Sequence, residues 1–191
     1  MNLINLNHIS IQSIKVKFSM HKKGSVHDRQ ALYQVHNRLF FRLFQVSNRL
    51  DRQCLNELGL SSIHWAVLGA LARSHVENGM VFSDLTEYLQ VSRQNLDGVL
   101  KRLERDQLVQ RRINLDDRRS KIVSLSTQGQ QLWQDLQDNI SIFYQQALSD
   151  LAFDDLISLV HLLNKVHSGL EQISIHSAKV EYPSVLNNCN Q

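Results

Sequence analysis

The sequence is poor in the residues that interrupt regular structure. Its 191 residues include one proline and seven glycines, which leaves little material for the many tight turns of a β-rich fold. With 42% hydrophobic residues, the chain is long enough to bury a real core. We therefore expect a mainly α-helical fold with a small β-hairpin.

Sequence signals of an enzyme or metal centre are also missing. The two cysteines, Cys54 and Cys189, are far apart, and no C-x-x-C, H-E-x-x-H or glycine-rich phosphate loop occurs. His161 and His167 are six positions apart, a spacing that does not place them on one helical face. We predict no enzymatic activity, no cofactor and no metal site. Two thiols, and no segment resembling a secretory signal or a membrane helix, favour a reducing cytoplasm.

An amphipathic helix is predicted directly after Val91. Ser92 is a favourable N-cap residue, and an inward apolar stripe follows at helical spacing, formed by Leu96, Val99, Leu100 and Leu103. The opposite face is left for a partner. Arginine pairs with guanine, and asparagine or glutamine with adenine, in the major groove of DNA. The residues of this helix that we assign to DNA contact are Ser92, Arg93, Gln94, Asn95, Asp97, Lys101 and Arg102.

A basic hairpin is predicted next, from two short strands at residues 109–113 and 122–125. A cationic hairpin tip suits the negative potential of a minor groove. Residues 91–121 carry nine Lys and Arg against five Asp and Glu, a net charge of +4, whereas the whole chain carries +3. The positive excess is therefore concentrated in this segment. The hairpin residues assigned to DNA contact are Asp117, which is close enough to orient an arginine, Arg118, Arg119 and Lys121.

The predicted helix and the predicted hairpin each have an alternative interpretation without DNA. The helix could be an ordinary solvated surface helix, and the hairpin could be a solubilising turn with a local ion pair. The order of motifs favours DNA binding. The segments L-S-S-I-H-W-A-V-L-G-A-L, F-S-D-L-T-E-Y-L-Q-V-S and D-D-R-R-S-K-I-V-S-L-S-T-Q-G, with the helix between the last two, resemble the MarR family of winged helix-turn-helix transcriptional regulators over about residues 32–170. Asp117 and Arg119 fall on the family's wing aspartate and arginine. The chain departs from the family at Gln107, usually glycine, and at Leu115, often proline.

The resemblance implies a homodimer that places two recognition helices on a palindromic operator. Apolar residues at near-heptad spacing in residues 31–50, and helical patterns at residues 130–148 and 156–166, favour such a dimer. We predict a DNA-binding lobe at residues 61–129 and dimerisation helices at 28–58 and 130–173, within one domain, 26–173. Residues 1–25 are predicted to be a disordered arm, unless Met20 is the natural start, and 174–191 a flexible tail. A monomeric helical bundle is the alternative.

The resemblance also implies a small aromatic acid or related effector that releases a repressor from DNA. The residues that we assign to this ligand by stacking and charge are Arg38, Phe40, Arg42, His64 and Trp65. Trp65 is equally typical of a plain core. Two alternatives stay open: a redox-sensing repressor that uses Cys54, and a winged-helix protein-interaction module without duplex affinity.

Overall fold

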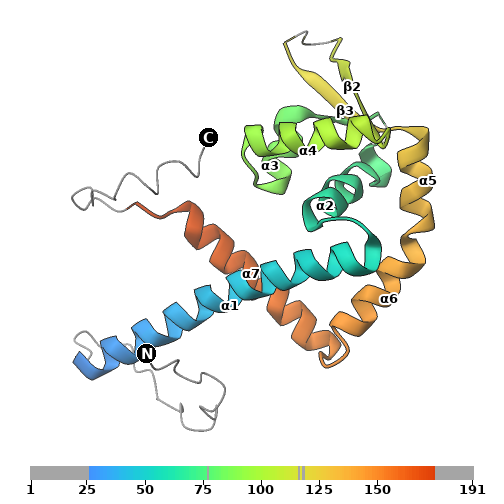
Figure 1. Ribbon diagram of the computed structural model, residues 1–191. Helices are drawn as coiled ribbons and strands as arrows, with labels where there is room; N and C mark the ends of the chain where they lie inside the picture. Colours follow the sequence, from blue (N-terminus) through green and yellow to red (C-terminus); the bar gives the residue numbers. More distant parts are fainter. Residues whose placement is uncertain (1–25, 77, 116, 118, 175–191) are drawn as a thin grey trace, which may run out of the picture. The chain divides into compact units, whose positions relative to one another are not determined.

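The computed structural model in Figure 1 describes residues 26–174, apart from positions 77, 116 and 118. The predicted N-terminal arm, the predicted tail beyond its first residue and the predicted DNA contact Arg118 lie outside the described residues. The chain divides between Trp133 and Gln134 into two compact units. The first unit therefore holds the first long helix together with the predicted DNA-binding lobe.

The architecture is mainly helical with one small sheet, as predicted. In the first unit the chain forms α1 (Val26–Leu58), α2 (Ser62–Leu71), the 3-10 helix η2 (Ser74–Val76), β1 (Met80–Val81), α3 (Phe82–Leu89), α4 (Arg93–Arg105), β2 (Val109–Ile113) and β3 (Lys121–Leu125). Helix α5 (Thr127–Asp135) runs across the boundary, and α6 (Gln137–Ala147) and α7 (Phe153–Glu171) follow in the second unit. In these described helices none combines the length and the apolar character that a membrane span requires.

The sheet is antiparallel, with strand order β1-β3-β2. Strands β2 and β3 form the predicted hairpin, in a register that places Val109 opposite Leu125 and Ile113 opposite Lys121. Strand β1 adds only two residues, and Met80 lies opposite Val123. The sequence did not predict β1, because two residues are too short to show an alternating pattern.

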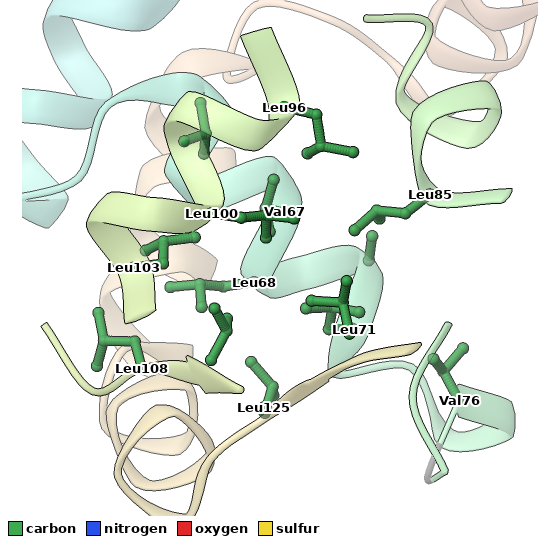
Figure 2. Close-up of a cluster of buried hydrophobic side chains, with 14 residues drawn as sticks. Val67, Leu68, Leu71, Val76, Leu85, Leu96, Leu100, Leu103, Leu108 and Leu125 are labelled. Atoms are coloured by element: carbon green, nitrogen blue, oxygen red, sulfur yellow. The ribbon is translucent and has the colours of Figure 1, made fainter. Parts of the chain in front are cut away.

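The core of the first unit lies between α2, α3, α4 and the sheet (Figure 2). All four residues of the predicted α4 stripe are buried, at 5% exposure or less. They pack with Val67, Leu68 and Leu71 of α2 and with Leu85 of α3. Burial of each such side chain stabilises the fold by about 1.5–3 kcal/mol. This stripe fixes the rotation of α4 and turns its polar face away from the core.

The turn between α4 and β2 explains the departure at Gln107. Gln107 has φ of 58°, the left-handed conformation that glycine adopts without penalty. Its amide donates to the carbonyl of Glu104 at 3.0 Å, and the Leu108 amide donates to the carbonyl of Leu103 at 2.8 Å. The hydroxyl of Ser126 donates to the Gln107 carbonyl. The turn thus has the backbone geometry that glycine favours, although the residue at this position is glutamine.

Replacing Gln107 with glycine should raise the free energy of unfolding by about 0.5–1 kcal/mol, because it removes the left-handed strain of a residue with a Cβ. Urea denaturation measures the change. The control is Gln110→Gly in strand β2, which should lower stability, because glycine is unfavourable in a strand. Equal effects of the two substitutions would contradict the strain at Gln107.

The C-terminal helices differ from prediction at one point. We predicted one helix at residues 130–148, but α5 ends at Asp135 and α6 begins at Gln137. At Leu136 the ψ angle is −10°, whereas a continuous α-helix needs about −42°. The prediction of one helix was wrong because the apolar periodicity continues across a backbone break that involves neither glycine nor proline.

Helices α1 and α7 expose much apolar surface in the single chain. On α1, Leu39, Phe40 and Phe44 are 43%, 50% and 66% exposed. Over Phe153–Glu171, α7 contains no buried residue, and its Val160 and Leu162 are more than half exposed. Contiguous apolar surface of this kind is typical of an interaction face.

Candidate nucleic-acid interface

The first turn of α4 presents three side chains of base-reading type. The Ser92 hydroxyl accepts a hydrogen bond from the Asn95 amide at 3.2 Å and so caps the helix, as the sequence predicted. Arg93, Gln94 and Asn95 are exposed. Ser92 is thus occupied by its own helix, and the three residues after it are available to base edges.

The turn between β2 and β3, which we call the wing turn, is held together by Asp117. Its Oδ1 accepts from the Arg119 amide at 3.0 Å, and its carbonyl accepts from the amide and the hydroxyl of Ser120, both at 2.9 Å. The Asn114 amide donates to the Ser120 carbonyl at 3.1 Å and closes the loop. Asp117 therefore orients the backbone of the turn, where we had expected it to orient an arginine side chain. The Arg119 side chain is left exposed.

An open groove joins these two parts. It lies between the first turn of α4, the start of α3 and the wing turn. Six residues that the sequence assigned to DNA contact line it: Arg93, Gln94, Asp97, Asp117, Arg119 and Lys121. The structure thus brings these six predicted residues to one concave, cation-lined face. Ser92, Asn95, Lys101 and Arg102, the other predicted contacts that the structure describes, do not line it.

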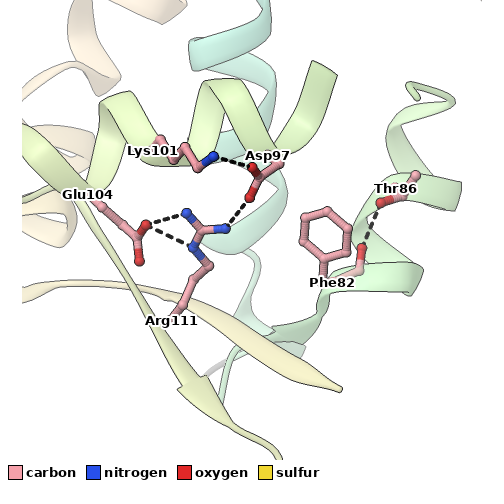
Figure 3. A network of polar contacts seen from close by, with 6 residues as sticks. All are labelled: Phe82, Thr86, Asp97, Lys101, Glu104 and Arg111. Atoms are coloured by element: carbon pink, nitrogen blue, oxygen red, sulfur yellow. Dashed lines mark hydrogen bonds and ion pairs between the residues drawn. The ribbon is translucent and has the colours of Figure 1, made fainter. Parts of the chain in front are cut away.

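An ion-pair network joins the wing to α4, the helix predicted to read the bases (the recognition helix; Figure 3). Nη1 of Arg111 on β2 donates to Asp97 Oδ1 at 2.6 Å, and its Nε donates to Glu104 Oε2 at 2.8 Å, with a further bond from Nη2 to the same oxygen. The Lys101 ammonium lies 2.8 Å from Asp97 Oδ2. Hydrogen bonds from Lys101 and Arg111 lower the pKa of Asp97 to about 2. The arrangement makes Asp97 an anchor of the wing, whereas we predicted a DNA contact.

No motif in the sequence indicates this network. Arg111 is only 12% exposed, and it engages both carboxylates on one flank of α4. Arg112 also bonds within the chain, donating from Nη2 to the Asn78 carbonyl at 2.6 Å. A signal was present, because Asp97 and Glu104 are seven positions apart and so share a helical face. Their pairing with a residue of the following strand was not readable, since the register of the helix against the sheet is a tertiary property.

The other flank of α4 faces the start of α2. Burial, and secondarily the charge of Arg102, lower the pKa of His64 from its ordinary value of 6.5. The Ser61 hydroxyl lies 2.9 Å from Nδ1 of His64. Arg102 is therefore close to His64, whereas Lys101 pairs with Asp97 on the flank toward the wing.

The predicted ligand residues are not all brought together within one chain. His64 and Trp65 are half-buried at the start of α2, which is tied to α1 because Asp51 Oδ1 accepts from the amide and the hydroxyl of Ser62 at 2.9 and 2.6 Å. Arg38 is thirteen residues before Asp51, roughly 20 Å along the helix axis. The exposed residues Arg42, Phe40 and Arg38 therefore lie progressively farther along α1 from the aromatic pair.

The predicted redox residue is poorly suited to reaction. Cys54 on α1 is 1% exposed, and burial raises the pKa of its thiol. A reactive thiol needs access and a lowered pKa. The redox alternative gains no support from this environment. Across residues 26–174, leaving out the three undescribed positions, no group of three His, Cys, Asp or Glu is arranged to hold a metal ion.

Sequence comparisons point to one family. A model of the MarR family matches residues 58–120. The transcriptional activatory protein BadR of Rhodopseudomonas palustris is 40% identical over 147 residues, which cover 75% of this chain and 84% of BadR. The homoprotocatechuate degradative operon repressor of Escherichia coli is 32% identical over 114 residues, or 60% of this chain and 75% of the repressor.

Solved structures agree on the fold. MepR of S. aureus in complex with DNA has a TM-score of 0.58 at 23% identity and covers 70% of this chain and 96% of its own. Reduced AbfR bound to DNA has a TM-score of 0.60 at 25% identity, with coverages of 75% and 99%. A mutant of E. coli MarR complexed with operator DNA has a TM-score of 0.58 at 25% identity, with coverages of 68% and 91%.

Proposed function

Since the chain belongs to the MarR family of DNA-binding transcriptional regulators, we propose that it is a homodimeric repressor, released from a palindromic operator by a small aromatic acid. The observation that carries its DNA interface is the groove that joins the capped first turn of α4 to the basic wing turn. The proposal places the protein in the cytoplasm, with its DNA target.

The residues divide by role. Arg93, Gln94 and Asn95 read base edges in the major groove, because their side chains form the exposed first turn. Lys101 and Arg102 contact phosphates and set affinity and its salt dependence. At the wing, Arg118, Arg119 and Lys121 supply charge beside the duplex, and Asp117 holds the turn. Asp97 acts through Arg111 and not through a base.

Replacing Arg119 with alanine should lower operator affinity by roughly tenfold or more and reduce the slope of log affinity against log salt by about 1. Fluorescence anisotropy across a salt series measures both quantities. Arg49→Ala, an exposed arginine on α1, is the matched control and should change neither. An unchanged salt slope for Arg119→Ala would refute the wing assignment.

The dimer part of the proposal is supported by the exposed apolar faces of α1 and α7. A second copy of the chain covers such faces in a two-fold arrangement, because the same patch then meets itself or its complement. The protein should sediment with twice the mass of one chain at micromolar concentration. A single-chain mass under those conditions would contradict the dimer.

The effector part is supported by a relative and by two side chains. The E. coli relative is named for repression of a homoprotocatechuate degradative operon. In this chain, Trp65 and His64 provide a half-buried ring surface on which an aromatic acid can stack. Arg38, Phe40 and Arg42, which would supply charge and a further ring, lie roughly 14–20 Å along α1 from Asp51, so the proposal takes them from a second copy of the chain. Quenching of Trp65 fluorescence by an aromatic acid, in a Trp133→Phe background, tests this site.

A further inference from the structure

Most glycines that the structure describes have a reason inside the chain to be glycine. Gly59 and Gly79 have φ of +68° and +82°, where a Cβ is strained. A Cβ at Gly69 would lie 2.9 Å from the Trp133 ring, and one at Gly129 would lie 1.9 Å from the Leu108 carbonyl oxygen. Packing or backbone conformation therefore accounts for all four positions.

Gly98 and Gly169 have no such reason. A Cβ added at either residue would meet nothing within 4 Å, and neither backbone is left-handed. Gly169 lies two residues before the end of α7, where a helix frays and glycine costs little. Gly98 is the sixth of thirteen residues in α4, where glycine is the least favourable helix residue after proline. The fold of the single chain thus does not account for Gly98.

Gly98 lies at the centre of the outward face of α4. Gln94, Gly98, Lys101 and Arg105 follow at spacings of four, three and four residues, and so form one ridge along the helix. This ridge is opposite the buried Leu96 and Leu100. Because Gly98 has no side chain, it leaves a gap in this ridge. Gln94 lies on one side of the gap, and Lys101 and Arg105 lie on the other.

None of the elements that the structure describes fills the gap. On one flank, Asp97 and Glu104 are held by Arg111 of the wing strand. On the other flank, Arg102 is near enough to His64 for its charge to lower the pKa of that imidazole. The backbone at Gly98 is exposed between these two flanks, so an outside group is able to reach it.

We propose that the sugar–phosphate chain of the operator lies in this gap, so that Gly98 is the point of closest approach between the recognition helix and the duplex. The inference rests on the proposed DNA-binding function. Lys101 and Arg105, one and two turns beyond Gly98, are exposed and carry charge that phosphates attract. Each is paired at the surface, Lys101 with Asp97 and Arg105 with Asp106, and exposed pairs of this kind are weak enough to be exchanged for a phosphate. The base-reading groups lie in the first turn, before the gap. A side chain at position 98 holds the helix away from DNA and weakens all contacts together.

The test compares Gly98→Ala and Gly98→Leu with Gln128→Ala as the control, an exposed helical position outside the groove and outside the predicted dimer helices. Thermal unfolding and fluorescence anisotropy are measured on each protein, with the DNA upstream of its own gene and with a scrambled duplex, at one salt concentration. Gly98→Ala should raise the midpoint temperature by about 2–4 °C while lowering affinity for both duplexes roughly tenfold. Gly98→Leu should lower affinity further. Gln128→Ala should leave affinity for both duplexes unchanged.

Two outcomes would overturn the inference alone. If the wild-type protein binds and Gly98→Ala binds equally well, nothing approaches the backbone there. If affinity falls only for the upstream DNA, and the loss traces to one base pair, a base edge and not the sugar–phosphate chain lies in the gap. Failure of the wild-type protein to bind either duplex would instead overturn the proposed DNA-binding function itself, and the inference with it.

Discussion

Replacing Arg111 with methionine should lower operator affinity by roughly a hundredfold and the free energy of unfolding by about 2 kcal/mol. Arg111 is nearly buried and makes three hydrogen bonds to carboxylates of the recognition helix. Its loss frees the wing strand from α4. It also leaves Asp97 and Glu104 with one fewer cation on a face that meets phosphates. Mobility shift and urea denaturation measure the two effects.

Two further variants separate these causes. Arg111→Lys keeps the charge but lacks the planar fork that engages both carboxylates, so it should recover only part of the affinity. Adding Asp97→Asn and Glu104→Gln to Arg111→Met removes the unpaired charges and should also recover part of it. Full DNA affinity in Arg111→Met would show that the wing is positioned without the network.

The network should also appear in the pH dependence of stability. The pKa of Asp97 is about 2 in the folded chain, below its ordinary value of 3.8, so its pairing stabilises the fold above pH 3.8. That contribution is lost as the pH falls through about 2. The stability difference between wild type and Asp97→Asn should therefore be present at pH 7 and shrink toward pH 2.

Replacing Gly129 with alanine should lower the free energy of unfolding by about 3 kcal/mol or more. The new Cβ would lie 1.9 Å from the Leu108 carbonyl oxygen, which is backbone and cannot rotate away. That carbonyl also accepts from the Ser126 amide at 3.1 Å, which holds the start of α5 against β2. Either the bond or the packing must break.

Urea denaturation compares Gly129→Ala with Gln128→Ala, the exposed neighbour on α5. The Gln128 variant should be neutral or slightly stabilising, because alanine is the better helix former. A Gly129 variant as stable as wild type would mean that α5 moves away from Leu108 without cost, and that the glycine of the L-S-T-Q-G segment serves another purpose.

Sequence patterns within short segments were sufficient to predict α4 and the β2–β3 hairpin. The Ser92 cap and the stripe of four apolar residues determine where α4 begins and which face it buries, and both are confirmed. Strand β2 has the predicted bounds, and β3 starts one residue earlier, at Lys121. Such features depend on neighbours within one turn of helix or along one strand.

Features that depend on distant contacts were not readable. The role of Arg111 requires the distance between β2 and α4, and the role of Gly129 requires the approach of α5 to Leu108. The break at Leu136 leaves the apolar pattern unchanged. The left-handed backbone at Gln107 was indicated only by the departure from the family's glycine. That departure marks the position, but it does not predict the backbone angles.

The decisive measurement is binding of the purified full-length chain to the DNA upstream of its own gene, by mobility shift across a salt series, with and without a panel of aromatic acids. We expect tight binding whose logarithm falls linearly with the logarithm of salt concentration, and release by at least one acid. Absence of binding at low salt would contradict the DNA interface and favour a winged-helix module that binds protein.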